Sequence, residues 1–319
     1  MKYAFLGNTG IEISKVCFGT LSISPLQGNF SLSEGEKVVC YAIDKGINFF
    51  DTAQLYETYN FLNRAIKYKK DIVISTKSYA YDKKTAKESF EKATKELGRD
   101  YIDIFMLHEQ ESKYTLKGHL EALEFFHEKK QQGYIGAVGV STHFIKCVLA
   151  AVQSEYAKYI DVIHMLYNLK GLGIVDGAKD EMLSSTQKAF DSGKGIFAMK
   201  PLGGGHLIQN KREALDFVLN SKQIHGFAIG LKSKAQIDYI CSLVENEDDE
   251  KIKVLHEQTN AENRKLMIHS WCIGCGNCVK MCKSGALSIV NNKAVVDKEK
   301  CILCSYCASA CKDFCIKII

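Results

Sequence analysis

The chain has 319 residues, of which 46% are hydrophobic and 25% charged; these are values of a globular protein with about two domains. Its formal net charge of +5 is small, and no basic and aromatic stripe accompanies it, so the composition argues against a nucleic-acid partner. The start, MKYAFLGNTG, lacks the basic region and long apolar run of a signal peptide, and the apolar runs are too short to span a bilayer. We therefore expect a cytoplasmic protein with no membrane partner.

Short β-rich runs alternate with amphipathic segments through the first part of the chain, after a hairpin at 3–14. Strands are expected at 16–20, 47–53, 72–77, 101–108, 135–142, 161–168, 195–201 and 225–230. Helical patterns lie between them, for example at 33–46, 83–98, 116–133 and 234–245. Eight such strands over about 240 residues match a parallel (β/α)8 (TIM) barrel better than a doubly wound sheet. The sequence therefore predicts an α/β barrel domain over residues 1–246.

The order of the strands also predicts where chemistry takes place, because the carboxyl ends of barrel strands share one pocket. The polar or small residues expected at those ends are Asp51, Lys77, His108, Ser141, His164, Lys200 and Gly230. Tyr56 lies on the loop just beyond the second strand. His143 and His206 lie near the expected mouth of the pocket, where we expect them to be solvated loop residues.

Four of these residues form a coherent set for reducing a carbonyl group. Hydride delivery to a carbonyl builds an alkoxide that needs a proton, and a tyrosine with a pKa of about 10 is a reluctant donor. The ammonium group of Lys77 is expected to lower the pKa of Tyr56. Asp51 would orient Lys77, and His108 would hydrogen-bond the carbonyl oxygen. The alternative interpretation is that each residue is an ordinary polar group on a barrel rim.

Several stretches, taken in their order along the chain, resemble motifs of the aldo/keto reductase family across roughly residues 3–245. These stretches are LGNTGIEIS, INFFDTAQLYE, IVISTK, IFMLH, IGAVGVS and MKPLGGG. The resemblance implies an NAD(P)H-dependent oxidoreductase that interconverts a small aldehyde or ketone and its alcohol. It also implies the catalytic residues, which are Asp51, Tyr56, Lys77 and His108.

The same resemblance implies a set of cofactor-binding residues. They are Gly19, Thr20, Ser141, Thr142, His164, Lys200, Pro201, Leu202, Gly230, Lys232, Ser233 and Gln236. Thr142 stands where the family usually has asparagine, His164 where it has glutamine, and Gln236 where it has arginine. The choice between NADP and NAD therefore stays open. The glycine run 203–205 would let a pyrophosphate approach the backbone, and a flavin is an alternative cofactor without a motif of its own.

A charged, helical linker is expected at 247–268, before a small domain at 269–319 that holds most of the cysteines. Nine of the 13 cysteines fall within 272–315. The spacing of Cys272, Cys275, Cys278 and Cys282 recurs 29 positions later. In a cytosolic chain such density points to metal and not to disulfides. Structural zinc favours CxxC pairs separated by a longer loop, whereas this spacing is CxxCxxCxxxC.

The repeated spacing resembles that of bacterial dicluster ferredoxins, which implies an α+β domain with two [4Fe–4S] clusters. In that family the fourth cysteine of each run binds the other cluster. The resemblance thus implies one ligand set of Cys272, Cys275, Cys278 and Cys311. It implies a second set of Cys301, Cys304, Cys307 and Cys282. Cys315 aligns with Ala286 of the first repeat, and we interpret it as an apolar packing residue.

The sequence leaves two functions open. In the first, the chain is a carbonyl reductase whose clusters stabilise it or exchange electrons with a redox protein partner. In the second, it is an electron-transfer protein whose barrel serves as a docking or nucleotide-sensing body, with a flavin as a possible addition. A cubane passes one electron at a time, whereas nicotinamide takes a hydride, so direct exchange between them would need an intermediary such as a flavin.

Overall fold

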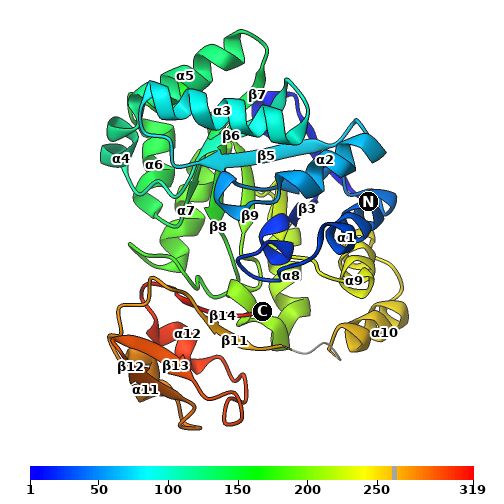
Figure 1. Ribbon diagram of the computed structural model, residues 1–319, viewed down its shortest axis with the longest axis vertical. Coiled ribbons are helices and arrows are strands. Elements are labelled where there is room, and N and C mark those ends of the chain that lie inside the picture. The colour runs from blue at the N-terminus through cyan, green and yellow to red at the C-terminus, as the bar shows by residue number, and fades with distance from the viewer. Residues whose placement is uncertain (261–263) are drawn as a thin grey trace.

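The larger part of the molecule is a closed barrel of eight parallel strands, as the sequence predicts (Figure 1). The computed structural model describes residues 1–260 and 264–319. Each barrel strand matches a predicted run, although β5 ends one residue beyond its run: β3 (Val16–Gly19), β4 (Phe49–Asp51), β5 (Val73–Ser78), β6 (Ile102–Leu107), β7 (Ile135–Thr142), β8 (Val162–Leu166), β9 (Gly195–Met199) and β10 (Gly226–Ile229). The barrel closes because β10 pairs with both β9 and β3.

Helices surround the barrel and bury their apolar faces against its outer surface. They are α1 (Leu32–Asp44), α2 (Tyr59–Tyr68), α3 (Lys83–Leu97), α4 (Lys113–Gly118), α5 (Leu120–Gln131), α6 (Ile145–Gln153), α7 (Lys179–Asp191), α8 (Lys211–Leu219) and α9 (Lys234–Glu245). The single helix expected at 116–133 is two helices. The chain leaves helical geometry at His119, which follows Gly118, a poor helix former.

The interior of the barrel is apolar at its amino-terminal end. The hairpin of β1 (Tyr3–Phe5) and β2 (Glu12–Ser14) closes this end, and Leu6 and Ile13 join the buried interior cluster beside Phe49 and Phe197. Because apolar side chains fill this end, the polar residues collect at the carboxyl ends of the strands, where the sequence predicts a pocket.

The segment 247–268, expected to be a helical linker, contains a helix and then a strand. Helix α10 covers Asp249–Asn260, and residues 261–263 of the expected linker lie outside the described residues. Leu266–Ile268 then forms a strand, β11, because it pairs with the distant strand β14 (Ile316–Ile318). Such long-range pairing overrides a local helical pattern, and it makes β11 part of the C-terminal unit.

The C-terminal unit is small and mixes short helices with strands, as the sequence predicts. It contains α11 (Asn277–Met281), β12 (Leu287–Val290), β13 (Lys293–Val296) and α12 (Tyr306–Ala310), besides β11 and β14. Strands β12 and β13 form an antiparallel hairpin, and the two short helices pack together. No helix within the described ranges is long and apolar enough to cross a membrane.

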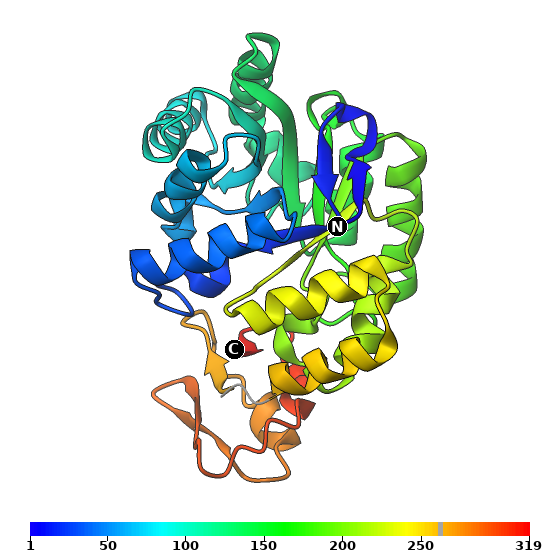
Figure 2. The same cartoon turned by 90° about the vertical axis from the view of Figure 1, so that its right-hand side faces the viewer.

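The C-terminal unit sits at the carboxyl end of the barrel, with β14 against the barrel loops (Figures 1 and 2). The His206 Nε2–H donates to the Ile316 carbonyl at 2.8 Å, and the His206 side chain is buried. This corrects the expectation of a solvated loop histidine at 206. A Cβ on Gly205 would lie 2.1 Å from the Ile318 carbonyl oxygen, so glycine here permits the close approach of β14.

Candidate active site and cluster cavities

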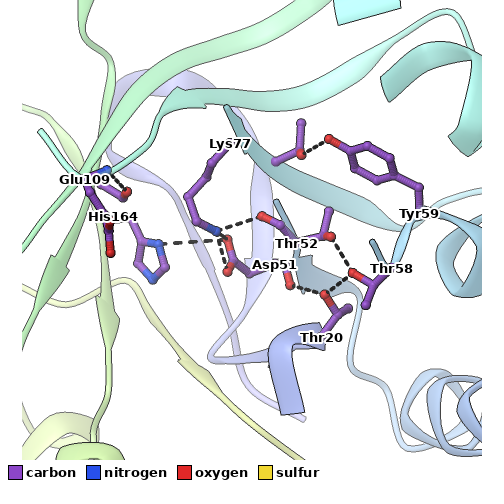
Figure 3. A network of polar contacts seen from close by, with 10 residues as sticks. Thr20, Asp51, Thr52, Thr58, Tyr59, Lys77, Glu109 and His164 are labelled. Carbon is purple, nitrogen blue, oxygen red and sulfur yellow. Dashed lines mark hydrogen bonds and ion pairs between the residues drawn. The ribbon is translucent and has the colours of Figure 1, made fainter. Parts of the chain in front are cut away.

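A buried ion pair anchors the predicted catalytic residues at the carboxyl ends of β4 and β5. The Lys77 ammonium donates to both carboxylate oxygens of Asp51 and to the Thr52 carbonyl, each at 2.7 Å (Figure 3). Both side chains are almost wholly buried. A buried pair is tolerable only when polar acceptors replace the lost water, and here three oxygens take the three donors of the ammonium group.

Tyr56 lies on the loop after β4, in the short 3-10 turn Gln54–Tyr56. Hydroxyl groups fix this loop: Thr58 hydrogen-bonds to both Thr20 and Thr52 at 2.7 Å, as Figure 3 shows. The Lys77 Nζ lies 5.2 Å from the centroid of the Tyr56 ring, and the His108 ring centroid lies 5.7 Å from it. The structure thus brings together all four residues predicted to be catalytic.

The pKa of Tyr56 differs from what the sequence suggests. Burial raises it well above 10, and the charges of Asp51 and Glu109 add to the rise. The expected lowering by Lys77 is absent because Asp51 already neutralises that ammonium group. Burial, with Lys77 and Lys200, lowers the pKa of His108 well below 6.5. At neutral pH the phenol is therefore protonated and the imidazole neutral.

Tyr79, which the sequence does not single out, packs on the His108 ring, and Glu109 holds Tyr79 in place. The Tyr79 ring stacks on His108 with centroids 4.6 Å apart, and its hydroxyl donates to the Glu109 carboxylate at 2.5 Å. The Glu109 N–H in turn donates to the Ser141 hydroxyl at 2.9 Å. The only sequence signal is that Glu109 follows His108 directly. Ser141 thus acts here as a support of the loop after β6.

His164 is buried beside the ion pair and lacks hydrogen-bond partners. Its ring stacks on Phe197 with centroids 3.9 Å apart, and its Nδ1 lies 3.9 Å from the Asp51 carboxylate. Neither ring nitrogen has a hydrogen-bond partner among the described residues. Because buried polar groups are nearly always paired, these nitrogens point to a ligand atom at this place. An amide-bearing ring such as nicotinamide fits that requirement.

The other residues implied as cofactor contacts, at the first and fifth barrel strands, mainly contact the protein backbone. Gly19 allows close contact with β10, because a Cβ added to Gly19 would lie 3.3 Å from the Ile229 carbonyl oxygen. Thr20 belongs to the hydroxyl chain described above. The Thr142 hydroxyl accepts from the Phe144 N–H at 2.9 Å, next to the start of α6.

The residues implied to hold the adenosine end lie at the start of α9. Ser233 caps this helix and accepts from the Gln236 N–H at 3.2 Å. The backbone N–H of Lys232 donates to the Gln236 side-chain oxygen at 2.8 Å. Gly230 faces Ser22, since a Cβ added to Gly230 would lie 2.7 Å from the Ser22 Cβ. The structure places these residues together at one end of the barrel mouth.

The loop after β9 meets the C-terminal unit. Lys200 has a left-handed backbone, and its ammonium group donates to the His143 Nε2 at 2.6 Å. Pro201 and Leu202 lead into the glycine run 203–205, and the Leu202 carbonyl accepts from the Gly205 N–H at 3.0 Å. Because β14 packs on these glycines, the face expected to receive a pyrophosphate is covered by the chain itself.

The structure gathers the eight predicted cluster cysteines around two cavities. The first is lined by Cys272, Cys275, Cys278 and Cys311, and the second by Cys282, Cys301, Cys304 and Cys307. Each cavity thus takes three cysteines from one repeat and the fourth from the other, in the crossed arrangement implied by the ferredoxin resemblance. Within the described part of the chain, no His, Cys, Asp or Glu side chains are grouped to hold a single metal ion.

Backbone donors favour thiolate at these cavities. The Ala294 N–H donates to Cys272 Sγ at 3.4 Å and lowers the pKa of that thiol. Burial acts to raise the pKa of Cys282, but the Ser284 hydroxyl and the Ala286 N–H outweigh it and lower the pKa. Four thiolates around a cavity with N–H donors to sulfur suit a cubane cluster.

Cys315 is a fifth thiol at the first cavity. Its Sγ lies 3.4 Å from Cys311 Sγ, and it is buried among the cavity-lining residues. At the second cavity Ala286 takes the corresponding place. Cys315 therefore packs as expected but also brings a sulfur atom to the cavity.

Comparisons with known proteins agree with this arrangement. Residues 15–268 match the model of the aldo/keto reductase family, and residues 265–312 match that of a 4Fe-4S dicluster domain. The chain is 28% identical to the uncharacterized oxidoreductase YqkF of Bacillus subtilis over 226 residues, covering 63% of this chain and 68% of that protein. It is 22% identical to L-galactose dehydrogenase of Arabidopsis thaliana over 271 residues, covering 73% and 85%.

Among solved structures, the holo form of aldo-keto reductase AKR11C1 from Bacillus halodurans superposes with a TM-score of 0.64 at 21% identity. The superposition covers 81% of this chain and 96% of that chain, which shows a shared fold. The family match spans most of the chain and includes all four residues at the buried ion pair. The chain is therefore a member of the aldo/keto reductase family of oxidoreductases that carries a 4Fe-4S dicluster domain in its C-terminal part.

Proposed function

We propose that the chain reduces a small aldehyde or ketone to an alcohol with NAD(P)H, and catalyses the reverse reaction. The observation that carries this proposal is the convergence of Tyr56 and His108 beside the Asp51–Lys77 pair. Family membership supports it, since the family reduces carbonyl compounds. The clusters would stabilise the protein or exchange electrons with a redox partner.

The state of each residue suits reduction. Because burial keeps the Tyr56 phenol protonated at neutral pH, it can give its proton to the oxygen of the reacting carbonyl. The neutral His108 can donate a hydrogen bond to the same oxygen and so orient it. Burial makes the phenolate that remains unfavourable, so Tyr56 readily takes up a proton again after each turnover.

The residues near His164 fit the reactive end of NAD(P)H, which supplies the hydride when it is bound. The partnerless ring nitrogens of His164 would hold the carboxamide group. The covered glycine run 203–205 means that the pyrophosphate would follow a different route from the one the family resemblance implies. Ser233 and Gln236, at the start of α9, are the residues proposed for the far end of the cofactor.

Tyr56→Phe tests this proposal. The variant removes only the hydroxyl group, and general acid catalysis contributes about 10²–10⁴-fold, so we expect the turnover number for an aldehyde to fall by at least about 100-fold. The measurement is NADPH oxidation by anaerobically purified protein, with the iron content and visible spectrum of each preparation recorded.

Tyr81→Phe is the matched control, because Tyr81 is exposed and also follows a barrel strand. It should leave turnover unchanged. Full activity of Tyr56→Phe with both clusters loaded would refute the assignment of Tyr56 as proton donor.

The contact of β14 with the barrel mouth favours a second candidate function. The first cluster cavity, lined by Cys311 and Ile316, adjoins the strand that touches the Gly203–Gly205 loop. In this alternative, the chain is an electron-transfer protein whose clusters serve a flavin bound at the barrel. Extraction of bound cofactors from anaerobically prepared protein decides between them: flavin would support the second function, and NADP(H) alone the first.

A further inference from the structure

The imidazole of His108 is buried, yet its Nδ1 has no hydrogen-bond partner among the described residues. The hydrogen bonds of this residue are made by its backbone: its N–H donates to the Ser78 carbonyl at 2.8 Å, and its carbonyl accepts from the Gln110 amide at 3.2 Å. A functional imidazole is commonly oriented by a hydrogen bond to one of its ring nitrogens. Because Nδ1 lacks such a bond, packing has to set the direction of this ring.

The ring of Tyr79 supplies this packing. It stacks on His108 with centroids 4.6 Å apart and planes inclined by 25°. The register of β5 and β6 explains the contact, since Ser78 pairs with Leu107 and the next residues along the two strands are Tyr79 and His108. Side chains at matching positions of neighbouring strands lie on the same side and close together. The backbone of the two strands therefore brings the two rings together.

The Tyr79 ring needs an anchor of its own because it is 47% exposed. Its hydroxyl donates to the Glu109 carboxylate at 2.5 Å. Partial burial and this hydrogen bond raise the pKa of Tyr79, so the hydroxyl keeps its proton and remains a donor. The far end of the ring is thus fixed, and an exposed aromatic side chain is restricted to one orientation.

The backbone at Glu109 has an unusual conformation that serves this anchor. Its φ of 51° is left-handed, which is uncommon for a residue other than glycine. Two bonds to Ser141 hold the turn: the Glu109 N–H donates to its hydroxyl at 2.9 Å, and the Gln110 N–H donates to its carbonyl at 2.8 Å. Conformations of this kind persist only where the surroundings fix them, and they are frequent at functional sites.

We propose that Tyr79 is a positioning residue of the carbonyl reductase reaction, whose ring holds the His108 imidazole in the orientation needed to hydrogen-bond the carbonyl oxygen. Glu109 takes part by holding the Tyr79 ring. This inference rests on the proposed carbonyl reductase function and deepens it. Because Tyr79 acts through His108, its removal should matter only while His108 is present.

Tyr79→Leu tests the proposal by removing the aromatic plane. Loss of a whole donor to the reacting oxygen costs about 10²–10³-fold in kcat, and a misdirected donor loses part of that, so we expect kcat for an aldehyde to fall at least about tenfold. KM should change less, because the hydrogen bond strengthens as charge develops on the oxygen in the transition state. Tyr79→Phe keeps the plane and should lie between Tyr79→Leu and the unaltered protein. Tyr81→Leu is the matched control, since Tyr81 is exposed in the same loop, and it should leave kcat unchanged.

A double-mutant cycle with His108 separates positioning from a general structural role. Added to His108→Ala, Tyr79→Leu should cause no further loss of kcat, because the imidazole that it holds is already gone. An equal loss in both backgrounds would show that Tyr79 supports the site in another way, and it would overturn the proposal.

Two variants of Glu109 separate the anchoring of Tyr79 from the charge of the carboxylate, which also acts on Tyr56. Glu109→Gln keeps an acceptor for the Tyr79 hydroxyl and removes the charge, so it should retain most of kcat. Glu109→Ala removes the acceptor and should match Tyr79→Phe, which lacks the same hydrogen bond. Equal losses in the two Glu109 variants would assign the effect to charge and refute the anchoring role.

Nuclear magnetic resonance of the holoprotein, prepared anaerobically with oxidised clusters, makes the contact testable without turnover. The ring current of a stacked phenol shifts the ring protons of its neighbour upfield, and the His108 resonances are identified by their loss in His108→Ala. We expect these resonances to move downfield in Tyr79→Leu and to move less in Tyr79→Phe. Unchanged resonances in Tyr79→Leu would refute the stacked arrangement.

The two sets of measurements distinguish failure of the reductase function from failure of the positioning role. If the unaltered protein reduces no aldehyde while the His108 resonances respond to Tyr79→Leu, the reductase function fails and the arrangement of the two rings stands. If Tyr79→Leu reduces an aldehyde as fast as the unaltered protein does, the positioning role fails and the reductase function stands.

Discussion

Two lysine side chains at the carboxyl end of the barrel, Lys77 and Lys200, differ in how their charge is compensated. Lys77 has three oxygen acceptors and a carboxylate partner, so its charge is fully compensated. The ammonium group of Lys200 has a neutral imidazole, that of His143, as its hydrogen-bond partner, and burial lowers the pKa of Lys200 to about 8. The first arrangement stabilises the site, whereas the second costs stability.

The cost of Lys200 predicts a pH dependence. Between pH 8 and about 10.5 the unfolded chain binds a proton at this residue that the folded chain does not, so stability rises with pH across this window. Below pH 8 the full penalty, about 3 kcal/mol, is present. Lys200→Met should remove the share of this rise that belongs to Lys200 and make the protein more stable at pH 7, while Lys317, whose pKa burial lowers to about 5, contributes a share of its own.

Hydrogen exchange of the barrel amides between pH 7 and 10, in buffer without phosphate and corrected for intrinsic exchange, measures this stability. Lys298→Met should keep the rise because Lys298 is exposed. An unchanged pH dependence in Lys200→Met would contradict the assignment of the penalty to this residue.

Among the elements, the barrel strands were predictable from the sequence, whereas strand β11 of the C-terminal unit was not. The composition of runs such as 72–77 and 135–142 is typical of strands, and the alternation of such runs with helical patterns predicts the barrel. Strand β11 depends on pairing with β14, about 50 residues away, which no local pattern reveals. The pKa of Tyr56 was mispredicted for a similar reason, since it depends on where the Lys77 ammonium group points.

The contact between β14 and the Gly203–Gly205 loop predicts an effect of Gly205→Ala. This glycine has a φ of 92°, and an added Cβ would meet the Ile318 carbonyl at 2.1 Å. We expect β14 to leave the barrel mouth and its amides to lose protection by about tenfold or more in hydrogen exchange.

Gly10→Ala is the matched control for backbone strain. Gly10 has a φ of 74°, but nothing lies within 4 Å of an added Cβ. Gly10→Ala should therefore strain the backbone without lowering the protection of the β14 amides. Equal protection of β14 in both variants would mean that the glycine loop does not seat this strand.

At the scale of the whole molecule, the crossed cysteine sets tie the two repeats together. Two cubanes contain about eight irons per chain. Cys282 has an alanine beside it at its cavity, whereas Cys311 has the nearby sulfur of Cys315. Cys282→Ala should therefore reduce the iron content to about four, and Cys311→Ala should lose less iron because Cys315 can replace it.

Iron and acid-labile sulfide assays after anaerobic reconstitution check this prediction. The double variant Cys311→Ala with Cys315→Ala should fall to about four irons, and Cys315→Ala alone should keep about eight. Four irons or fewer in the unaltered protein would contradict the dicluster interpretation. The resemblance of the cysteine spacing to dicluster ferredoxins implies the ligand sets, but the role of Cys315 depends on a distance that the sequence does not contain.

The position of β14 has a thermodynamic consequence. One strand joins the first cluster cavity to the barrel mouth, so occupation of either place stabilises the same seated arrangement. Such coupling is reciprocal: whatever a bound cluster adds to the affinity for a ligand at the barrel mouth, the ligand adds to the retention of the cluster. The availability of iron and the supply of substrate would then govern one another through a single short strand.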